Sequence, residues 1–496
     1  MSKTHKKSPR KSNPKGKADV NETNGRKLGL KPPEHVKVFY DIRNGDYWHR
    51  MNGRYIPMKK SDLMMQLRGI GLREKIYFDG QREIDWPLYE AQNKRMVDYA
   101  GALAGHRVGL FQDGSKRQYL VTDEAAGVFE KIPPCSKTNE PKFFRQFVEE
   151  ILPNDQWVFF CHWLAIGLRS LIAGDFRPGQ VCLFAGEHGS GKSLLQNMVT
   201  EIYGGRVGNP FLYMTGETNF NRDFVGAEHW MIEDPRGNID MRSRREFGAR
   251  LKEACVNRDY TVHAKGKDGI YLPLLRRVTI SVNLELEYLS VCPPIDPSIA
   301  DKINLFLCSG SRDNPLPIFT NFRDPKTGEL SRPKIWEKVM AEIPHVRSWL
   351  LASFRAADIT RTLRDDRFGI KAFHHPVLEA ELSSLSHESR LLELIDECYW
   401  SDEPPHTKVT KKAAEIQKDL LEKNRFEAEK ILRYPGACGS HLGKLVRSQP
   451  KRVAKNPLSH GYQTWTIFPP SPMEDKNQIP LGVTTFAMDA GTVAPV

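Results

Sequence analysis

The sequence lacks the features that mark membrane, secreted and disulfide-bonded proteins. It has no run of 18 apolar residues, so we expect no membrane span, and no apolar segment follows the basic amino terminus, which argues against a secretory signal. The eight cysteines are scattered without C-x-x-C pairs, which argues against a disulfide scaffold or a zinc site. These absences predict a protein of the reducing cytoplasm.

Positive charge is abundant and unevenly placed. The formal net charge is +12, and residues 1–32 carry ten Lys or Arg residues against two acids. This segment is too polar to offset the entropy of ordering, so we interpret it as a disordered basic arm, either a non-specific nucleic-acid contact or a solubilising tail. A basic balance suggests an anionic polymer as partner, although solvated lysines are the commoner explanation.

The most informative stretch is an apolar strand followed by a glycine-rich loop. Val181–Ala185 precedes the pattern G-x-x-x-x-G-K-S, and a helix is predicted from Leu194 to Tyr203. In such a P-loop, backbone N–H groups cradle a triphosphate at a helix N-terminus, the lysine contacts the β- and γ-phosphates, and the serine hydroxyl binds Mg²⁺. We therefore predict ATP and Mg²⁺ as cofactors, with Lys192 catalytic and Ser193 a metal ligand. The predicted nucleotide-binding residues are Gly186, Glu187, His188, Gly189, Ser190, Gly191, Lys192 and Ser193.

Two later apolar strands end in polar side chains. Trp230 to Ile232 precedes Glu233 and Asp234, and an acidic strand tip downstream of a P-loop is typical of the Walker B element. One acid there holds Mg²⁺ and the next activates water. The usual order is Asp then Glu, so the two roles stay open, with Glu233 as the predicted metal ligand. The strand from Val278 ends in Asn283, whose amide is predicted to orient the attacking water, although Asn favours strand ends in any case.

A predicted β-hairpin lies between these two strands in the sequence. Tyr260 to Ala264 alternates, residues 265–269 (KGKDG) form a tight tip, and the chain returns from Ile270. Each lysine at the tip can add one phosphate contact with nucleic acid, whereas the alternative is an ordinary solvated turn. The predicted DNA contacts are His263, Lys265 and Lys267.

Taken in order, the segments GEHGSGKS, WMIED, HAKGK and ISVN resemble the superfamily 3 helicases, which are AAA+ P-loop ATPases. Within that superfamily they are similar to the poxvirus-type helicase part of phage and plasmid primase-helicases. The stretch PPIDPSIADKINLFLC resembles the family segment after the sensor strand, and FYDIRNGDYWHRMNGRYI is a looser match. The resemblance implies an AAA+-type sheet and a homo-hexameric, ATP-driven translocase on single-stranded DNA.

The resemblance also implies residue roles. It places Lys192 and Ser193 on the P-loop pair, Glu233 and Asp234 on the Walker B pair, and Asn283 on the sensor. Lys265 and Lys267 fall on the DNA hairpin, and Lys302 falls where many members carry an Arg that acts on the ATP of a neighbouring subunit. A surface lysine at a strand start is the alternative for Lys302, and it would leave Arg276, Arg277 and Arg312 as candidates.

The predicted fold class is α/β, with a P-loop AAA+-like ATPase core, a small α+β N-terminal domain and a C-terminal winged-helix-like domain. In the last domain, helices precede a short basic hairpin, and Lys444, Arg447, Lys451 and Arg452 lie on or near the last helix and wing, which suggests duplex DNA as a further partner. The predicted boundaries are a disordered basic arm at 1–32, the N-terminal domain at 33–139, the ATPase/helicase domain at 140–320, a connecting segment at 321–387, the winged-helix-like domain at 388–470 and a disordered tail at 471–496.

The predicted function is an ATP-dependent DNA helicase or translocase that acts in replication of a phage, plasmid or other mobile element. The alternative is a DNA-binding replication initiator, or a regulatory or defence ATPase, that is switched by ATP and does not unwind DNA. Residues 1–140 contain no convincing D-x-D motif for priming, so any primase or polymerase is expected on a separate chain.

Overall fold

The computed structural model describes residues 36–469 except 76, 79, 234–240, 267, 290, 294, 296, 385–386, 401–407 and 459–460. The predicted arm and tail lie outside the described residues, as do Asp234 and Lys267. The chain divides into two compact units, residues 1–382 and 383–496, and each is described by itself.

The first unit begins with a small α+β part. Its four-stranded sheet has the order β3-β2-β1-β6. The first three strands form an antiparallel meander, which the Asn-Gly turns at residues 44–45 and 52–53 predict from the sequence. Two helices cover one face of this sheet over a core that includes Val38, Tyr47, Leu63 and Leu67. The elements are β1 (Val38–Asp41), β2 (Asp46–Met51), β3 (Arg54–Met58), α2 (Lys60–Gly69), α3 (Trp86–Lys94) and β6 (Met96–Val97).

Two small sheets complete this part of the chain. One pairs β4 with β5, and the other is three-stranded in the order β7-β9-β8. The strands are β4 (Tyr77–Phe78), β5 (Gln81–Arg82), β7 (Tyr99–Gly101), β8 (Gly109–Gln112) and β9 (Gln118–Val121).

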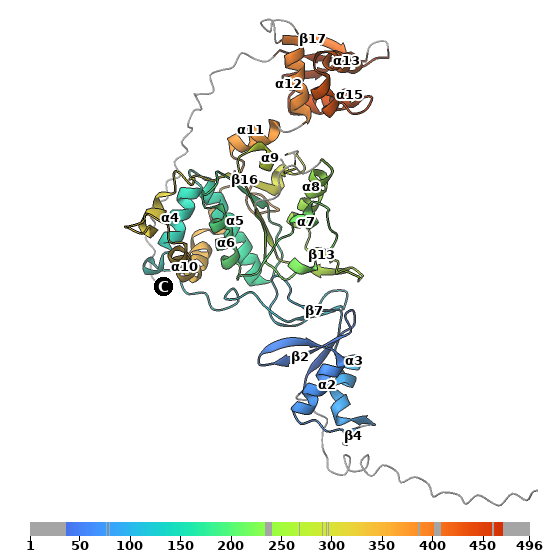
Figure 1. Cartoon of the computed structure of the whole chain (residues 1–496), viewed down its shortest axis with the longest axis vertical. Coiled ribbons are helices and arrows are strands. Elements are labelled where there is room, and N and C mark those ends of the chain that lie inside the picture. Colours follow the sequence, from blue (N-terminus) through green and yellow to red (C-terminus); the bar gives the residue numbers. More distant parts are fainter. Residues whose placement is uncertain are drawn as a thin grey trace, which may run out of the picture. The chain divides into compact units, whose positions relative to one another are not determined.

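A five-stranded parallel sheet forms the centre of the first unit (Figure 1). Its order is β11-β12-β15-β10-β16, so the strand before the P-loop lies between β15 and β16. All five residues of β10 are buried, which explains its unbroken apolar sequence, because both faces of a parallel sheet are covered. The strands are β10 (Val181–Ala185), β11 (Val207–Gly208), β12 (His229–Ile232), β15 (Arg277–Val282) and β16 (Ile303–Leu307).

Helices cover both faces of this sheet, with α5 and α6 on one side and α7 and α8 on the other (Figure 1). Right-handed crossovers that run in opposite directions along a parallel sheet produce this arrangement. One core cluster joins α4, α5, α6 and α10 to β10 and β16 through residues such as Phe147, Trp163, Phe184 and Phe306. The α-helices of this part are α4 (Lys142–Ile151), α5 (Gln156–Ala173), α6 (Lys192–Ile202), α7 (Phe211–Met214), α8 (Met241–Val256), α9 (Leu286–Leu289), α10 (Arg332–Ser353) and α11 (Pro376–Ser384).

Among the described residues, α5 alone is long and apolar enough to cross a membrane by length and composition. It is 61% buried within the protein and contributes Phe160, Trp163 and Leu164 to the core cluster. The core helices of globular domains have the same properties, so this helix is weak evidence for a membrane span.

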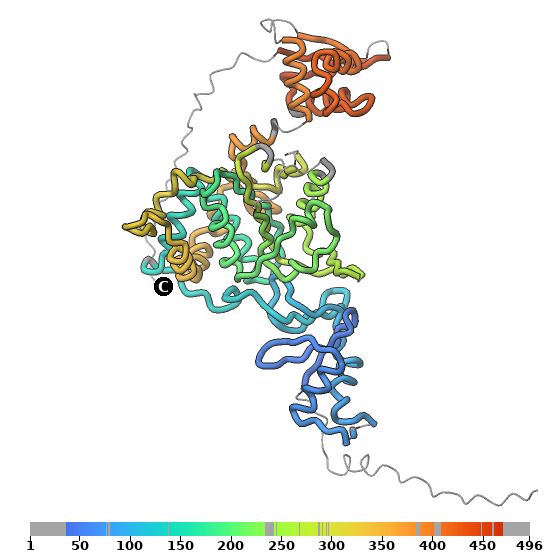
Figure 2. The backbone as a smooth tube through the Cα atoms, viewed as in Figure 1, coloured from blue at the N-terminus to red at the C-terminus, as the bar shows by residue number. Residues whose placement is uncertain are grey.

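One antiparallel hairpin stands apart from the central sheet. It consists of β13 (Asp259–Val262) and β14 (Ile270–Pro273), close to the predicted strands. Figure 2 shows it projecting from the part of the first unit that holds the central sheet, beside the chain segment that holds β7. Short 3₁₀ helices are η1 (Glu83–Asp85), η2 (Lys137–Asn139), η3 (Arg222–Phe224), η4 (Ala300–Lys302), η5 (Pro317–Phe322) and η6 (Ala356–Asp358).

The second unit has its own apolar core, which includes Leu391, Ile416, Leu442 and Trp465. Its three-stranded antiparallel sheet has the order β17-β19-β18. The sequence predicts the hairpin of β18 and β19 after the helices, but not β17, which lies between α12 and α13 in the chain. The elements are α12 (His387–Trp400), β17 (Val409–Lys412), α13 (Ala413–Lys423), α14 (Arg425–Ile431), α15 (Ala437–Ser448), β18 (Val453–Lys455) and β19 (Thr464–Ile467).

Candidate nucleotide and DNA sites

The P-loop joins β10 to α6 at the carboxyl edge of the central sheet. Gly189 and Gly191 have φ angles of +82° and +102°, which residues with side chains rarely adopt. A Cβ atom added to Gly186 would lie 2.9 Å from the Cβ of Cys308. The loop therefore requires glycine for two reasons, backbone conformation and close packing, and α6 begins directly after it at Lys192.

Lys192 is held at this edge by short contacts. Its side chain is buried, and Nζ donates to the carbonyl oxygens of Gly186 and Glu187, each at 2.8 Å. Nζ also donates to Oδ1 of Asn283 at 3.2 Å. Because β10 and β15 are parallel neighbours, the residues that follow them meet at the same edge, and the two predicted site residues are in contact.

The loop offers the donors that a phosphate group requires. In the described part of the chain, the N–H groups of His188, Gly189 and Gly191 meet no hydrogen-bond acceptor. Together with the N-terminus of α6 and the Lys192 ammonium, these donors fit the triphosphate of ATP. Ser193 is exposed in the first turn of α6, where its hydroxyl is an oxygen ligand of the kind that Mg²⁺ prefers.

The acidic strand tip is placed at the same edge. Glu233 is exposed and directly follows β12, which pairs with β15, whereas Asp234 lies outside the described residues. No group of three or more His, Cys, Asp or Glu side chains within the described ranges could hold a metal ion. Mg²⁺ in nucleotide sites takes most of its ligands from phosphate and water, so Ser193 and Glu233 would supply its protein oxygens.

A buried polar network behind the P-loop joins α6 to two strands. His229 Nδ1 lies 2.7 Å from Thr200 Oγ1, and its Nε2 lies 2.8 Å from Thr279 Oγ1. Gln196 Nε2 donates to the same Thr279 hydroxyl at 2.8 Å. Burial lowers the pKa of His229 to about 3, so the imidazole is neutral at physiological pH. Sequence reasoning missed this network because its members come from three elements without a shared motif.

The hairpin presents the predicted DNA contacts at its tip. Gly266 has a φ of +73°, as a tight turn requires, and nothing lies close to where its Cβ would be. His263 and Lys265 are exposed, and Lys267 lies outside the described residues. The described tip is therefore open to a polyanionic partner.

Asn221 fixes the base of this tip and was also missed from the sequence. It is buried, its Oδ1 accepts from the N–H of His263 at 2.7 Å, and its Nδ2 donates to the carbonyl of Thr261 at 2.8 Å. The amide thus pairs with the backbone of β13 and its extension as a neighbouring strand would. Nothing in the local sequence distinguishes this Asn from a turn residue.

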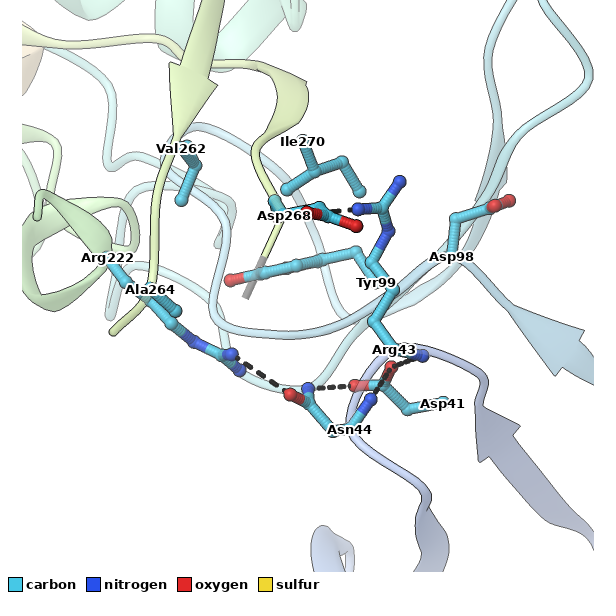
Figure 3. A pocket seen from close by; sticks show the side chains of 10 residues that line it. All are labelled: Asp41, Arg43, Asn44, Asp98, Tyr99, Arg222, Val262, Ala264, Asp268 and Ile270. Carbon is cyan, nitrogen blue, oxygen red and sulfur yellow. Dashed lines mark hydrogen bonds between the residues drawn. The ribbon is translucent and has the colours of Figure 1, made fainter. Parts of the chain in front are cut away.

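The small α+β part touches the other side of the hairpin tip (Figure 3). Arg43 Nη1 donates to the carbonyl oxygens of Asp268 at 3.5 Å and Gly269 at 3.4 Å. Arg222 Nη1 donates to Asn44 Oδ1 at 3.3 Å. All of these residues except Gly269 line a cavity of about 30 Å³, which has room for about one water molecule. The turn between β1 and β2 is therefore a second support of the hairpin.

Lys302 lies at the opposite edge of the sheet from the P-loop. It directly precedes β16, whose first residue pairs with the first residue of β10. Its Nζ donates to Asp301 Oδ1 at 2.6 Å and to the Ser298 carbonyl at 2.9 Å. Lys302 therefore cannot contact a nucleotide on its own P-loop, and action on a neighbouring subunit stays a prediction.

Arg276 and Arg277, the alternatives to Lys302, are buried inside the fold. The Arg276 guanidinium lies 4.8 Å and 4.6 Å from the ring centroids of Trp230 and Tyr260, and burial lowers its pKa to about 10. Arg277 Nη1 donates to the carbonyl of Arg177 at 3.1 Å. Their burial prevents either residue from reaching a neighbouring subunit.

In the second unit, the predicted basic residues differ in their surroundings. Lys444 Nζ donates to Glu388 Oε1 at 2.8 Å, and Arg452 Nε donates to the Phe468 carbonyl at 3.0 Å. Arg447 and Lys451 are exposed. Lys444 is exposed as well, but its charge is paired with Glu388, so Arg447 and Lys451 are the better placed for a contact with DNA.

Comparisons with known proteins give a likeness of fold. No protein-family model matches the sequence, and neither does any curated protein. The A-form apo structure of the NrS-1 C-terminal region is 13% identical and aligns over 91% of this chain and 100% of its own, with a TM-score of 0.50. A JCV helicase bound to a small molecule is 12% identical over 46% of this chain and 58% of its own, but its TM-score of 0.27 supports no argument. The NrS-1 likeness supports an α/β architecture and nothing about activity.

Proposed function

We propose that this chain is an ATP-dependent DNA helicase or translocase that acts in replication of a phage, plasmid or other mobile element. The observation that carries the proposal is the contact between Lys192 Nζ and Asn283 Oδ1, at the edge where the parallel strands β10 and β15 end. A P-loop lysine paired with a strand-tip amide is an arrangement suited to hydrolysis as well as to nucleotide binding. The hairpin with Lys265 at its exposed tip follows the acidic strand in the same part of the chain.

The proposed cofactors are ATP and Mg²⁺, which together supply a phosphoryl group that water can attack. Lys192 is proposed to neutralise charge on the β- and γ-phosphates, and Asn283 to orient the water. Ser193 and Glu233 would bind the metal, and either Glu233 or Asp234 would accept the proton from the water.

The proposed partner of the hairpin is single-stranded DNA. His263, Lys265 and Lys267 would contact its phosphates, and nucleotide-dependent movement between subunits of a homo-hexamer would carry the hairpin along the strand. Lys302 is proposed to act on the ATP of the next subunit as a point charge. We also propose that a separate chain supplies any primase or polymerase and that the second unit binds duplex DNA. The proposed location is the cytoplasm.

The rival function is an ATP-switched DNA-binding initiator or regulator without unwinding activity. A translocase should show ATP hydrolysis that is stimulated several-fold by single-stranded DNA and should displace an annealed oligonucleotide from forked DNA. A switch should hydrolyse ATP slowly at a rate that DNA does not change. Forked substrates that lack one or the other single-stranded tail measure unwinding activity and the direction of translocation together. Failure to displace the annealed oligonucleotide from any of these substrates would favour the rival.

A further inference from the structure

The loop that follows β16 lies directly on the P-loop. The N–H of Cys308 donates to the carbonyl of Ala185 at 2.7 Å, and the N–H of Arg312 donates to the carbonyl of His188 at 3.0 Å. The two loops therefore form one layer at the carboxyl edge of the sheet, although more than 100 residues of sequence separate them.

Gly189 shows how close this approach is. A Cβ atom at Gly189 would lie 3.0–3.1 Å from the N, Cα and Cβ atoms of Arg312, a distance that real Cβ atoms seldom reach. Its φ of +82° disfavours a side chain for a second reason. The backbone of Arg312 therefore rests against the stretch of the P-loop whose N–H groups have no described acceptor.

The loop that carries Arg312 is itself held in place. The N–H of Ser311 donates to the carbonyl of Asn314 at 2.9 Å, and the N–H of Asn314 donates back to the Ser311 hydroxyl at 2.9 Å. These bonds close a tight turn around Arg312. An arginine on a fixed turn keeps its guanidinium within a small region of space.

We propose that Arg312 binds a phosphate of the nucleotide held by its own P-loop. This inference rests on the proposed function. The side chain is exposed, and a guanidinium presents a planar fork of donors that matches phosphate oxygens. Its Cα lies against Gly189, so the long side chain has the phosphate position within its reach.

The same geometry separates Arg312 from Lys302. The two residues flank β16 at opposite ends, and a strand of this length spans about 16 Å. Arg312 therefore acts in cis, on the nucleotide of its own chain, whereas Lys302 is available only for the nucleotide of another. Two cations that flank one strand would then serve two different nucleotide sites, one on the same chain and one on a neighbouring chain.

Direct binding of a fluorescent ATP analogue tests this assignment without relying on hydrolysis. Arg312→Ala should weaken the affinity at least about tenfold, because a charge-assisted hydrogen bond is lost, and Arg312→Lys should recover part of it. Arg323→Ala removes an exposed arginine that bonds to the Gly328 carbonyl and serves as the matched control, with unchanged affinity. Equal thermal melting of all variants excludes a loss of folding as the cause.

Three results would overturn the inference. If the wild type binds the analogue and Arg312→Ala binds it with the same affinity, Arg312 does not belong to the site and the proposed function remains intact. If the wild type does not bind the analogue, both this inference and the proposed function fail. Mixing Arg312→Ala with Lys192→Ala subunits gives a second arm. A cis role predicts ATPase no greater than the sum of the separate variants, whereas recovery in mixed oligomers would show that Arg312 acts in trans.

Discussion

The carboxyl edge of the central sheet and the β13–β14 hairpin are held in very different ways. At the sheet edge, Lys192 is buried and donates hydrogen bonds of 2.8–3.2 Å to Gly186, Glu187 and Asn283. The hairpin lies outside that sheet, and its exposed tip is supported by Asn221 on one side and Arg43 on the other. Both regions contain buried side chains, since Tyr260 and Leu272 of the hairpin strands are buried, but the tip of the hairpin is exposed and is held by a few polar contacts.

This difference corresponds to two physical requirements. Hydrolysis needs charged groups positioned before the reaction begins, because reorganisation during the reaction would raise the barrier. Translocation needs an element that changes position at modest cost, and regions with few buried contacts open most readily. The proposed function assigns the first task to the sheet edge and the second to the exposed tip of the hairpin.

The largest effect should come from the fixed region. Lys192→Ala should lower the rate of ATP hydrolysis on the order of 10²–10³-fold, since a charge aimed at the phosphates is removed. Nucleotide affinity should fall less, because the backbone donors of the loop remain. Steady-state ATPase and direct nucleotide binding measure the two effects, and hydrolysis at the wild-type rate would show that the P-loop assignment is wrong.

Removal of the second unit should leave both regions of the comparison unchanged. A chain that ends at Leu382 should keep its ATPase activity, because the sheet and hairpin belong to the first unit. Its affinity for duplex DNA should fall about tenfold or more, since each lost phosphate contact weakens binding. Arg447→Ala with Lys451→Ala in the full chain should reproduce part of the loss, and full duplex affinity in the truncated chain would contradict the DNA-binding role.

The hairpin support can be broken separately from the hydrolytic site. Asn221→Ala leaves the His263 N–H and the Thr261 carbonyl without their partner, at a local cost of about 1–3 kcal/mol. We expect unstimulated ATPase to remain and the several-fold stimulation by single-stranded DNA to be lost. Asn219→Ala, two residues earlier and exposed, is the control. Normal stimulation in Asn221→Ala would mean that the hairpin does not need this support.

Sequence reasoning located the fixed region better than the hairpin supports. The apolar runs Val181 to Ala185 and Ile303 to Leu307 predict β10 and β16 with their observed bounds, because buried parallel strands are continuous apolar runs. The apolar period predicts a helix only from Phe247 to Val256, whereas α8 begins at Met241, since its first turns are polar and show no apolar period. β17 (VTKK) was missed because it is short and polar at a sheet edge.

The two missed residues share one physical reason. Asn221 and His229 make their contacts with residues that are distant in sequence, so no local spacing predicts those contacts. Arg312 was a candidate only for a neighbouring subunit, because the sequence does not show that its loop lies on the P-loop. The P-loop could be predicted because its backbone conformation and chemistry both fall within eight consecutive residues. Lys192 and Asn283 could be paired only by assuming that their strands are neighbours, which the sheet order supports.

The buried network of the fixed region should make stability depend on pH. His229 has a folded pKa of about 3 against 6.5 for the free side chain, so the unfolded chain binds more protons at acid pH. Stability should therefore be fully present above pH 6.5 and fall by about 1.4 kcal/mol per pH unit below it. His162, with a pKa lowered by burial to about 4, adds to the slope.

Urea unfolding between pH 7.5 and 5 measures this slope. At pH 7.5 the free energy of unfolding of His229→Gln should be about 1–3 kcal/mol below that of the wild type, because the hydroxyls of Thr200 and Thr279 lose well-aligned hydrogen bonds. On acidification the variant should lose less stability than the wild type. Replacement of the exposed His263 by Gln should leave the slope unchanged. An identical slope in His229→Gln and the wild type would show that His229 titrates normally in the folded protein.

The most direct test of the account is the salt dependence of DNA-stimulated ATP hydrolysis in the wild type and in Lys265→Ala with Lys267→Ala. The account predicts equal unstimulated rates, several-fold stimulation of the wild type by single-stranded DNA, and little or no stimulation of the variant. The dependence of DNA binding on salt should also fall by about two phosphate contacts. Stimulation and salt dependence equal to those of the wild type would contradict the claim that the hairpin couples ATP hydrolysis to DNA.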